Sequence, residues 1–201
     1  MAEEDAWFEF VAGYQYLEHD NPSGTPSRIR AYPGDTHTVP YGTTINAGFK
    51  IRNTGTDQAI CSFRVDDTEN KLRKEYGGWL PPYSWYSDEW HENPLASPTF
   101  TMGDESIVLK LRACRYVGGT DWITDEESTI TLLPEKCYQE ICVTDTAGNA
   151  INGATLTVEG VEYNTGADNC RTFYLVKGKT ITVTASKTGY NDNDKTFTIG
   201  D

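Results

Sequence analysis

Histidine, serine, cysteine and acidic side chains are the groups in this chain that could bind a metal or carry out catalysis. The three histidines are His19, His37 and His91. His91 lies in the acidic stretch DEWHEN, but a tight transition-metal site needs three or four convergent ligands, and this stretch offers one imidazole. No serine or cysteine has the glycine-flanked elbow or the neighbouring base that activates a nucleophile. The sequence therefore predicts a protein that is not an enzyme, with no catalytic residue, no metal site and no cofactor.

The carboxylates support the same interpretation. Several acidic residues are adjacent in the chain, for example Asp66-Asp67, Asp88-Glu89 and Glu126-Glu127. Neighbouring side chains on a strand point to opposite faces, so the two carboxylates of a pair cannot lie on the two sides of one substrate bond. We expect them instead to be solvated residues at the ends of strands. Asp192 and Asp194 in GYNDNDK lack the glycine and the closing glutamate of an EF-hand loop, so they give only a weak calcium signal.

The five cysteines are Cys61, Cys114, Cys137, Cys142 and Cys170. None of their spacings is CxxC, so we expect disulfides in an oxidising location rather than zinc. Cys61 with Cys114 is the preferred pair, because both lie in well-formed predicted strands. Alternation places Ile141 and Val143 inward and Cys142 outward, and it leaves both Cys137–Cys170 and Cys142–Cys170 open. The competing interpretation is that the cysteines are buried thiols that pack as small hydrophobic residues.

Composition excludes several classes of function. Thirty acidic residues against seventeen basic ones give a net charge of −13, which repels phosphate backbones and anionic lipid headgroups. We therefore expect no nucleic-acid binding and no membrane insertion. No apolar run is long enough to span a bilayer, and the acidic start MAEEDAWFEF does not resemble a signal peptide. Together with the cysteines, these features fit a mature secreted protein, an intracellular protein of a thermophile or a virion component. Of these, we expect an extracellular or virion-surface location.

The hydrophobic pattern alternates with period two, and helical periodicity is nearly absent. Turn clusters such as NTGTD, GGTD and PGDT separate the clearest segments. The strands predicted in the first part of the chain are residues 44–53, 59–67, 98–102, 106–117 and 128–133. Short antiparallel strands with such turns are typical of a β-sandwich.

Beyond Leu133 the strands become rich in threonine and recur about every dozen residues. They are predicted at residues 141–145, 154–160, 171–176, 180–185 and 195–200. Charge changes as well: residues 1–134 hold 11 basic and 21 acidic residues (net −10), and residues 135–201 hold 6 and 9 (net −3). We therefore expect an all-β protein of two tandem sandwiches, an immunoglobulin-like domain at 1–134 and a smaller domain at 135–201.

The second part resembles the carboxypeptidase regulatory-like and Cna-B-like family of small sandwiches. The resemblance rests on VTDTAGNAINGATLTVEG and on YNTGADNCRTFYLVKGKTITVTASKTGY. It covers about 60 residues and implies a non-enzymatic spacer or binding module. Some relatives carry a Lys to Asn/Asp isopeptide cross-link. This chain has no lysine in residues 141–145 and no amide at an inward position of KTFTIG, so we expect disulfides instead.

The first part more loosely resembles the adhesion-type, CARDB-like immunoglobulin-like domains of archaeal and bacterial surface proteins and of some viral structural proteins. VPYGTTINAGFKIRNTGTDQAICSFRV carries this resemblance. PTFTMGDESIVLKLRAC corresponds to the late strands and GGTDWITDEESTITL to the last hairpin. The resemblance implies a domain that docks or presents other domains.

An aromatic stretch, YGGWLPPYSWYSDEWH, holds six of the 24 aromatic residues in sixteen positions. They are Tyr76, Trp79, Tyr83, Trp85, Tyr86 and Trp90. Gly77-Gly78 and Pro81-Pro82 predict a turn followed by an extended segment, 83–91, with aromatic rings on both faces. One face then belongs to the core, and the other is open to a partner. Burial of all three tryptophans and a sugar-binding platform are the two alternatives.

These observations favour a non-enzymatic structural or decorating subunit of a virion or an extracellular surface. It would assemble with copies of itself or with other structural subunits through its β-sandwich domains. A carbohydrate-binding or adhesin module that uses Trp79, Trp85 and Trp90 is the alternative, with glycans as its ligands.

Overall fold

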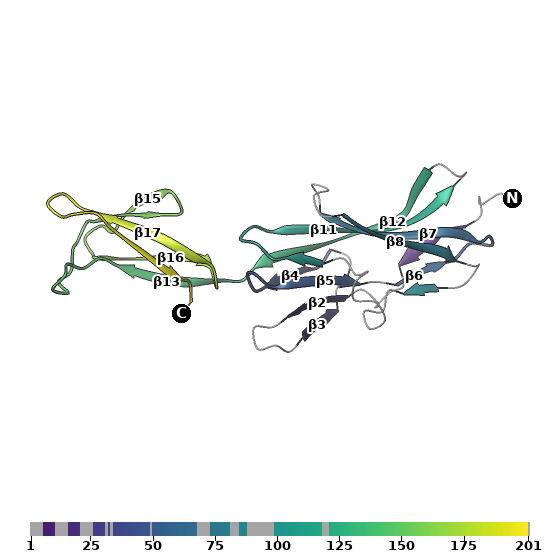
Figure 1. Cartoon of the computed structure of the whole chain (residues 1–201), viewed down its shortest axis with the longest axis horizontal. Helices are drawn as coiled ribbons and strands as arrows, with labels where there is room; N and C mark the ends of the chain where they lie inside the picture. Colours follow the sequence, from purple (N-terminus) through teal and green to yellow (C-terminus); the bar gives the residue numbers. More distant parts are fainter. Residues whose placement is uncertain are drawn as a thin grey trace. The chain divides into compact units, whose positions relative to one another are not determined.

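The computed structural model describes residues 6–10, 16–20, 26–30, 32, 34–48, 50–67, 73–80, 85–87, 99–117 and 121–200. For residues 16–20, 26–30, 46–48, 50, 61–63, 67, 73–80, 85–87, 99 and 121 it describes the backbone alone. Every regular element in these residues is a β-strand (Figure 1). The predicted all-β class is therefore confirmed. Within the same residues, no helix has the length and apolar character needed to cross a membrane.

The chain divides into two compact units. The first comprises Met1–Val39 and Thr43–Leu133, and the second comprises Pro40–Gly42 and Pro134–Asp201. The main division falls beside Pro134, where the composition of the predicted strands changes from one with many aromatic residues to one rich in threonine.

The first unit contains three antiparallel sheets. The largest has the order β4-β12-β11-β7-β8 and is made of β4 (Thr36–Val39), β12 (Asp121–Pro134), β11 (Ile107–Val117), β7 (Ala59–Asp67) and β8 (Arg73–Leu80). The second has the order β10-β5-β2-β3, from β10 (Thr99–Thr101), β5 (Thr44–Gly48), β2 (Tyr16–Asp20) and β3 (Pro26–Arg30). The third has the order β1-β6-β9, from β1 (Phe8–Phe10), β6 (Lys50–Asn53) and β9 (Trp85–Ser87).

One core joins these sheets. Leu109 and Leu111 alternate on β11 and are almost fully buried, and Val65 lies opposite Leu111 on β7. Phe8 from β1 and Ile45 from β5 belong to the same cluster. The two smaller sheets therefore cover the inner face of the large sheet, which is the layered arrangement that period-two patterning predicts.

A β-bulge attaches β1 to this layer. Ala113 pairs with Glu126 and Cys114 pairs with Thr124, so Asp125 is the extra residue on β12. Its buried carboxylate accepts hydrogen bonds from the Phe8 backbone N (3.0 Å) and from Arg115 Nε (2.9 Å). Burial raises the pKa of Asp125, and its hydrogen bond from Phe8 and the charge of Arg115 oppose that shift only in part.

The second unit is a smaller sandwich of two sheets. One sheet pairs β13 (Lys136–Cys142) with β16 (Cys170–Val176). The other has the order β15-β14-β17-β18, from β15 (Val161–Asn164), β14 (Thr155–Val158), β17 (Thr180–Ser186) and β18 (Asn193–Thr198). Their core contains Leu156, Val158, Phe173, Val183 and Ile199.

Several predicted elements are changed by the structure. Residues 44–53 do not form one strand, because β5 pairs with β2 and β10 whereas β6 pairs with β1 and β9. Gly77-Gly78 is not a turn, because both residues pair with β7 inside edge strand β8. The last strand of the first unit begins at Asp121 rather than 128, and the first strand of the second unit begins at Lys136 rather than 141.

Adjacent carboxylates are also not all solvated. The Asp66 side chain is fully buried and forms a close ion pair with Arg112. Glu126 accepts a close hydrogen bond from the Phe10 backbone N. Glu127 lies 3.8 Å from Lys110 Nζ. These carboxylates pair with basic side chains or accept hydrogen bonds from the backbone of the first unit. The prediction that the adjacent carboxylates are solvated is wrong for Asp66, because its side chain is fully buried.

Candidate functional site

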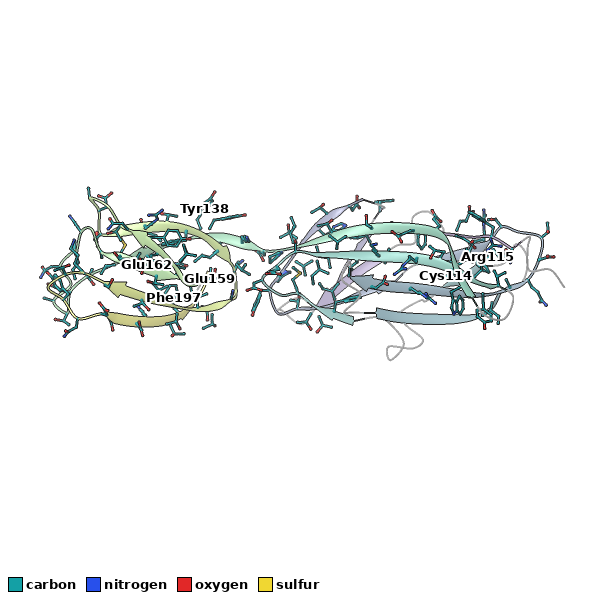
Figure 2. The ribbon with its side chains drawn as sticks, turned by 90° about the horizontal axis from the view of Figure 1, so that it is seen from above. Cys114, Arg115, Tyr138, Glu159, Glu162 and Phe197 are labelled. Carbon is teal, nitrogen blue, oxygen red and sulfur yellow. A yellow bond between two sulfur atoms is a disulfide. The ribbon has the colours of Figure 1, made fainter. Side chains whose placement is uncertain are left out.

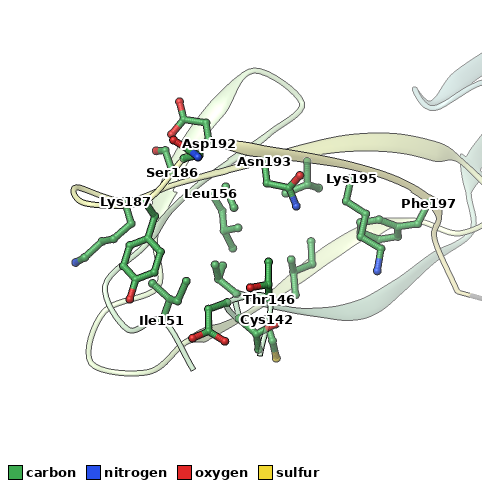
Figure 3. A pocket seen from close by; sticks show the side chains of 18 residues that line it. Cys142, Thr146, Ile151, Leu156, Ser186, Lys187, Asp192, Asn193, Lys195 and Phe197 are labelled. Carbon is green, nitrogen blue, oxygen red and sulfur yellow. The ribbon is translucent and has the colours of Figure 1, made fainter. Parts of the chain in front are cut away.

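The second unit has a groove between its two sheets, bordered by the edge strands β13 and β18. At one end the sandwich is closed, because the Gly200 backbone N donates a hydrogen bond to Gln139 Oε1 (3.4 Å). Toward Cys142 and Asn193 the two sheets leave a cavity of about 840 Å³ between them (Figure 3). This volume is within the range of small-molecule sites, about 300–1,000 Å³.

The floor of the groove is apolar. Leu156 and Val183 come from the four-stranded sheet and are almost fully buried, while Ile141 from β13 and Phe197 from β18 are half-buried. Ile151 closes one side beside Cys142 and Thr146, and Asn193 lies across the groove from them (Figure 3). The floor is therefore core of the sandwich that remains accessible from one side.

The rim carries hydrogen-bonding groups. Its neutral members are Thr144, Thr146, Ser186, Asn191 and Asn193, and its charged members are Asp145, Asp192, Lys187 and Lys195. Tyr190 adds a phenol ring that is 55% exposed. Amides, hydroxyls and one aromatic ring over an apolar floor can bind a ligand that has both polar and apolar faces.

Asp145 is held in place by the turn that follows it. Its Oδ1 accepts hydrogen bonds from the backbone N of Ala147 (2.9 Å) and Asn149 (2.8 Å), and its Oδ2 accepts one from Asn149 Nδ2 (2.9 Å). These hydrogen bonds, those from Asn149 first, hold the pKa of Asp145 below its usual value. Asp145 is therefore a fixed anion at the rim, as expected for a carboxylate that accepts several hydrogen bonds.

Hydrogen bonds also hold the part of the rim that contains Lys187 and Tyr190. Lys187 Nζ donates to the Gly153 carbonyl (2.9 Å), and the Tyr190 backbone N donates to the Lys187 carbonyl (3.0 Å). Gly153 has φ +64°, and a Cβ there would lie 3.1 Å from Lys187 Nζ. A side chain at position 153 would therefore strain the turn and displace the lysine.

The outer face of the β13–β16 pair presents two tyrosines, which we call the tyrosine face. Tyr138 and Tyr174 are directly opposite in the ladder, and their ring centroids are 5.0 Å apart at an interplanar angle of 40°. Tyr138, labelled in Figure 2, is 78% exposed, and Tyr174 is 59% exposed. Lys136 Nζ lies 5.9 Å from the Tyr174 ring centroid. Two large aromatic rings in tilted contact and exposed to solvent form a patch of the kind that marks an interaction surface.

A disulfide joins Cys142 and Cys170 at the end of the same ladder, where the two residues are directly opposite and their Cα atoms are 4.0 Å apart. One of the two pairings left open for Cys170 is thus realised, and Cys142 is exposed as alternation predicts. Cys137 keeps its thiol and packs against the core of the second unit.

The preferred pair, Cys61 with Cys114, is wrong. In the ladder Cys61 is opposite Arg115 and Cys114 is opposite Ser62, so the two cysteine positions belong to opposite faces of the sheet. Cys114 carries a buried thiol, whose Sγ lies 3.6 Å from Thr124 Oγ1. The sequence placed both cysteines in strands, but it did not reveal that their positions in the β7–β11 ladder are offset by one residue.

The predicted aromatic surface is only partly described. The backbones of Tyr76 and Trp79 lie in β8, and those of Trp85 and Tyr86 lie in β9. Tyr83 and Trp90 lie outside the described residues, as does His91. The faces that these side chains occupy therefore remain a prediction.

Two other predicted chemical groups are placed. His37 Nε2 lies 3.6 Å from Asp35 Oδ2, a local contact in the first unit. Asp192 belongs to the groove rim, and Asp194 lies on β18 opposite Thr184. In the described residues, the one group of three or more potential metal ligands is Glu140, Cys142 and Cys170.

Sequence reasoning missed the groove and the tyrosine face. KCYQEIC, residues 136–142, alternates strictly in exposure, and this alternation could have shown that Tyr138 faces outward. The groove has no such local signal, because its lining comes from segments far apart in the chain.

Comparison with known proteins adds no identification: the chain matches no family model and no curated protein.

Proposed function

We propose that this chain is a non-enzymatic structural or decorating subunit that works by contact with other proteins, including copies of itself. The observation that carries this proposal is the tyrosine face, Tyr138 and Tyr174 on the outer surface of the β13–β16 pair. The expected resemblance of the second unit to small presentation domains agrees with it, as does the absence of a catalytic constellation in the sequence.

The physical case rests on what an interface needs. Tyrosine buries a large, rigid ring at a small cost in side-chain entropy, and its hydroxyl keeps a polar partner. Tyrosines are also enriched among the residues whose removal costs 2 kcal/mol or more of binding energy. β13 and β16 pair only with each other in the described part of the chain, so backbone groups at this small sheet's edges add further contact sites.

Sedimentation velocity over a wide range of protein concentrations tests self-assembly. We expect the wild-type chain to associate, and the Tyr138→Ser/Tyr174→Ser variant to raise the dissociation constant by about 30-fold or more, the equivalent of one strong interface residue. Tyr190→Ser is the matched control, because Tyr190 is similarly exposed but lies at the groove. A wild-type chain that is monomeric at all concentrations, and that is missing from virion and cell-surface fractions of its source, would refute the proposal.

The location that we propose is an extracellular or virion surface. The Cys142–Cys170 disulfide is compatible with a secreted protein, because disulfides persist in oxidising compartments. We propose no nucleic-acid partner, in keeping with the net charge of −13.

A carbohydrate-binding or adhesin module is the second candidate, and the groove favours it. Tyr190 offers a ring for a sugar face, while Asp145 and Asn193 offer hydrogen-bond acceptors and donors. A glycan array tests it, with Tyr190→Ala and Asn193→Ala as groove variants and Trp85→Ala as the variant of the aromatic stretch. Binding lost only in the groove variants supports this site, binding lost only in Trp85→Ala moves the site to the aromatic stretch, and silence across the array removes this candidate.

A further inference from the structure

Three potential metal ligands converge at the open end of the β13–β16 pair. Cys142 and Cys170 are joined as a disulfide, and a carboxylate oxygen of Glu140 lies with both sulfur atoms in a cluster less than 4.8 Å across. Glu140 precedes Cys142 by two residues on β13, so both project from the same exposed face. Cys142 also lines the groove, and Glu140 lies two positions from Tyr138 on the same face of β13, so the cluster borders both the groove and the tyrosine face.

The ladder would keep the two sulfurs close even without their bond. Seven residue pairs join β13 and β16, and six of them remain when the cysteine pair is set aside. Because the two cysteine Cα atoms are 4.0 Å apart, small side-chain rotations are enough to separate the sulfurs to about 3.8 Å. That is the separation of two sulfurs bound tetrahedrally to zinc at about 2.3 Å each.

The surroundings suit a cation. In the described part of the second unit, the ion pairs join Lys177 to Glu135 and Lys179 to Glu159, and neither includes Glu140. The neighbouring Arg171 points elsewhere: its guanidinium lies 4.8 Å from the Tyr163 ring centroid and donates to the Asn164 carbonyl. On the other side, Asn169 Nδ2 donates to the Val143 carbonyl (3.1 Å), which directs Asn169 Oδ1 to within 3.6 Å of Cys170 Sγ.

We propose that Cys142, Cys170 and Glu140 form a metal site that is available only when the disulfide is reduced, and that it takes a thiophilic divalent cation such as Zn²⁺. Two molecules of a thiol reductant supply two electrons and two protons, the sulfur–sulfur bond breaks, and the reductant becomes a disulfide. The cation then binds both cysteine sulfurs as thiolates and releases two protons to solvent. Glu140 supplies the third ligand, and a water molecule or Asn169 Oδ1 completes four-coordination.

The site would let one pair of sulfurs connect β13 to β16 in either redox state. Under oxidising conditions the covalent bond joins the strands, and under reducing conditions the bound cation does so. This inference does not depend on the proposed assembly function, because it concerns the stability of the second unit.

Cobalt titration of the full-length chain tests the site. The chain is reduced with dithiothreitol, desalted without oxygen, and titrated with Co²⁺ beside an oxidised sample. We expect the reduced chain to bind about one Co²⁺ with sulfur-to-cobalt charge-transfer absorption, Zn²⁺ to displace it, and the oxidised chain to show neither. Circular dichroism of the same samples should show that Zn²⁺ raises the melting temperature of the reduced chain, since it binds the folded state.

Variants separate this site from the other thiols. Cys142→Ser should abolish the cobalt signal, and Glu140→Gln should weaken binding by about tenfold or more. Cys137→Ser is the matched control and should leave the signal unchanged. The proposal is overturned if the oxidised chain gives the same band, if the reduced chain binds no cobalt or stays unfolded with excess metal, or if Cys137→Ser rather than Cys142→Ser removes the signal.

Discussion

Removing the Cys142–Cys170 disulfide should destabilise the second unit and leave the first unit unchanged. The perturbation is the Cys142→Ser/Cys170→Ser variant, whose two serines replace sulfurs at the exposed end of the ladder. The bond closes a loop with a sequence separation of 28, so the chain-entropy relation gives a loss of about 3.6 kcal/mol. For a unit of roughly 70 residues this corresponds to a fall in melting temperature of about 15–30 °C.

The tryptophans make the assay specific for each unit. All five lie before the boundary, at Trp7, Trp79, Trp85, Trp90 and Trp122. Tryptophan fluorescence therefore follows the first unit, whereas far-ultraviolet circular dichroism follows the strands of both. Urea unfolding with both signals should show the dichroism transition of the second unit moving to lower denaturant while the fluorescence transition stays in place.

Two results would refute this reasoning. A loss of less than about 1 kcal/mol would show that the unfolded second unit is already constrained, or that the disulfide contributes little. A shift of the fluorescence transition as large as that of the dichroism transition would show that the two units do not unfold separately. Reduced wild-type chain, measured without metal, is the second sample, because it loses the bond without any substitution.

Three further predictions concern pH dependence and the core. Burial raises the pKa of Asp125 in the folded chain above its value in the unfolded chain, which is about 4. Between these two pKa values the unfolded chain is already deprotonated at Asp125 while the folded chain still holds the proton. The free energy of unfolding of the first unit should therefore fall as the pH rises from the unfolded pKa to the folded pKa. Asp125→Asn should flatten that part of a fluorescence-detected stability profile, and an unchanged profile would contradict the buried carboxylate. Asn149→Ala removes the main hydrogen-bond donor of Asp145, so the Asp145 pKa should rise toward its usual value in an NMR titration, and no rise would contradict the turn. Leu111→Ala should cost the first unit about 2–5 kcal/mol by urea unfolding, and a cost below about 1 kcal/mol would place Leu111 outside the core.

Much of the fold could be predicted from the sequence because burial on one face produces alternation. The segments 59–67 and 106–117 became β7 and β11 almost as predicted, since Val65, Leu109 and Leu111 alternate with polar residues. The break between β5 and β6 was missed, because alternation continues through it while the pairing partners change.

Less of the candidate site could be predicted. Alternation correctly placed Cys142 on the exposed face, yet it left two partners open for Cys170, because it does not specify which residues lie opposite. The register error for Cys61 and Cys114 has the same origin. Tyr138 and Tyr174 are 36 positions apart in the chain, and only the β13–β16 ladder brings their rings together.

By itself, the sequence determined the all-β class, the change of texture near Pro134 and the face on which most strand residues lie. These properties depend on the hydrophobicity of neighbours in the chain. Tertiary structure decided the pairing of Cys142 with Cys170, the ionic role of Asp66, the bulge that places Asp125 beneath β1, and the groove between β13 and β18. Each of these depends on strand register or on where two sheets separate, and both are set by packing between residues that are distant in the sequence.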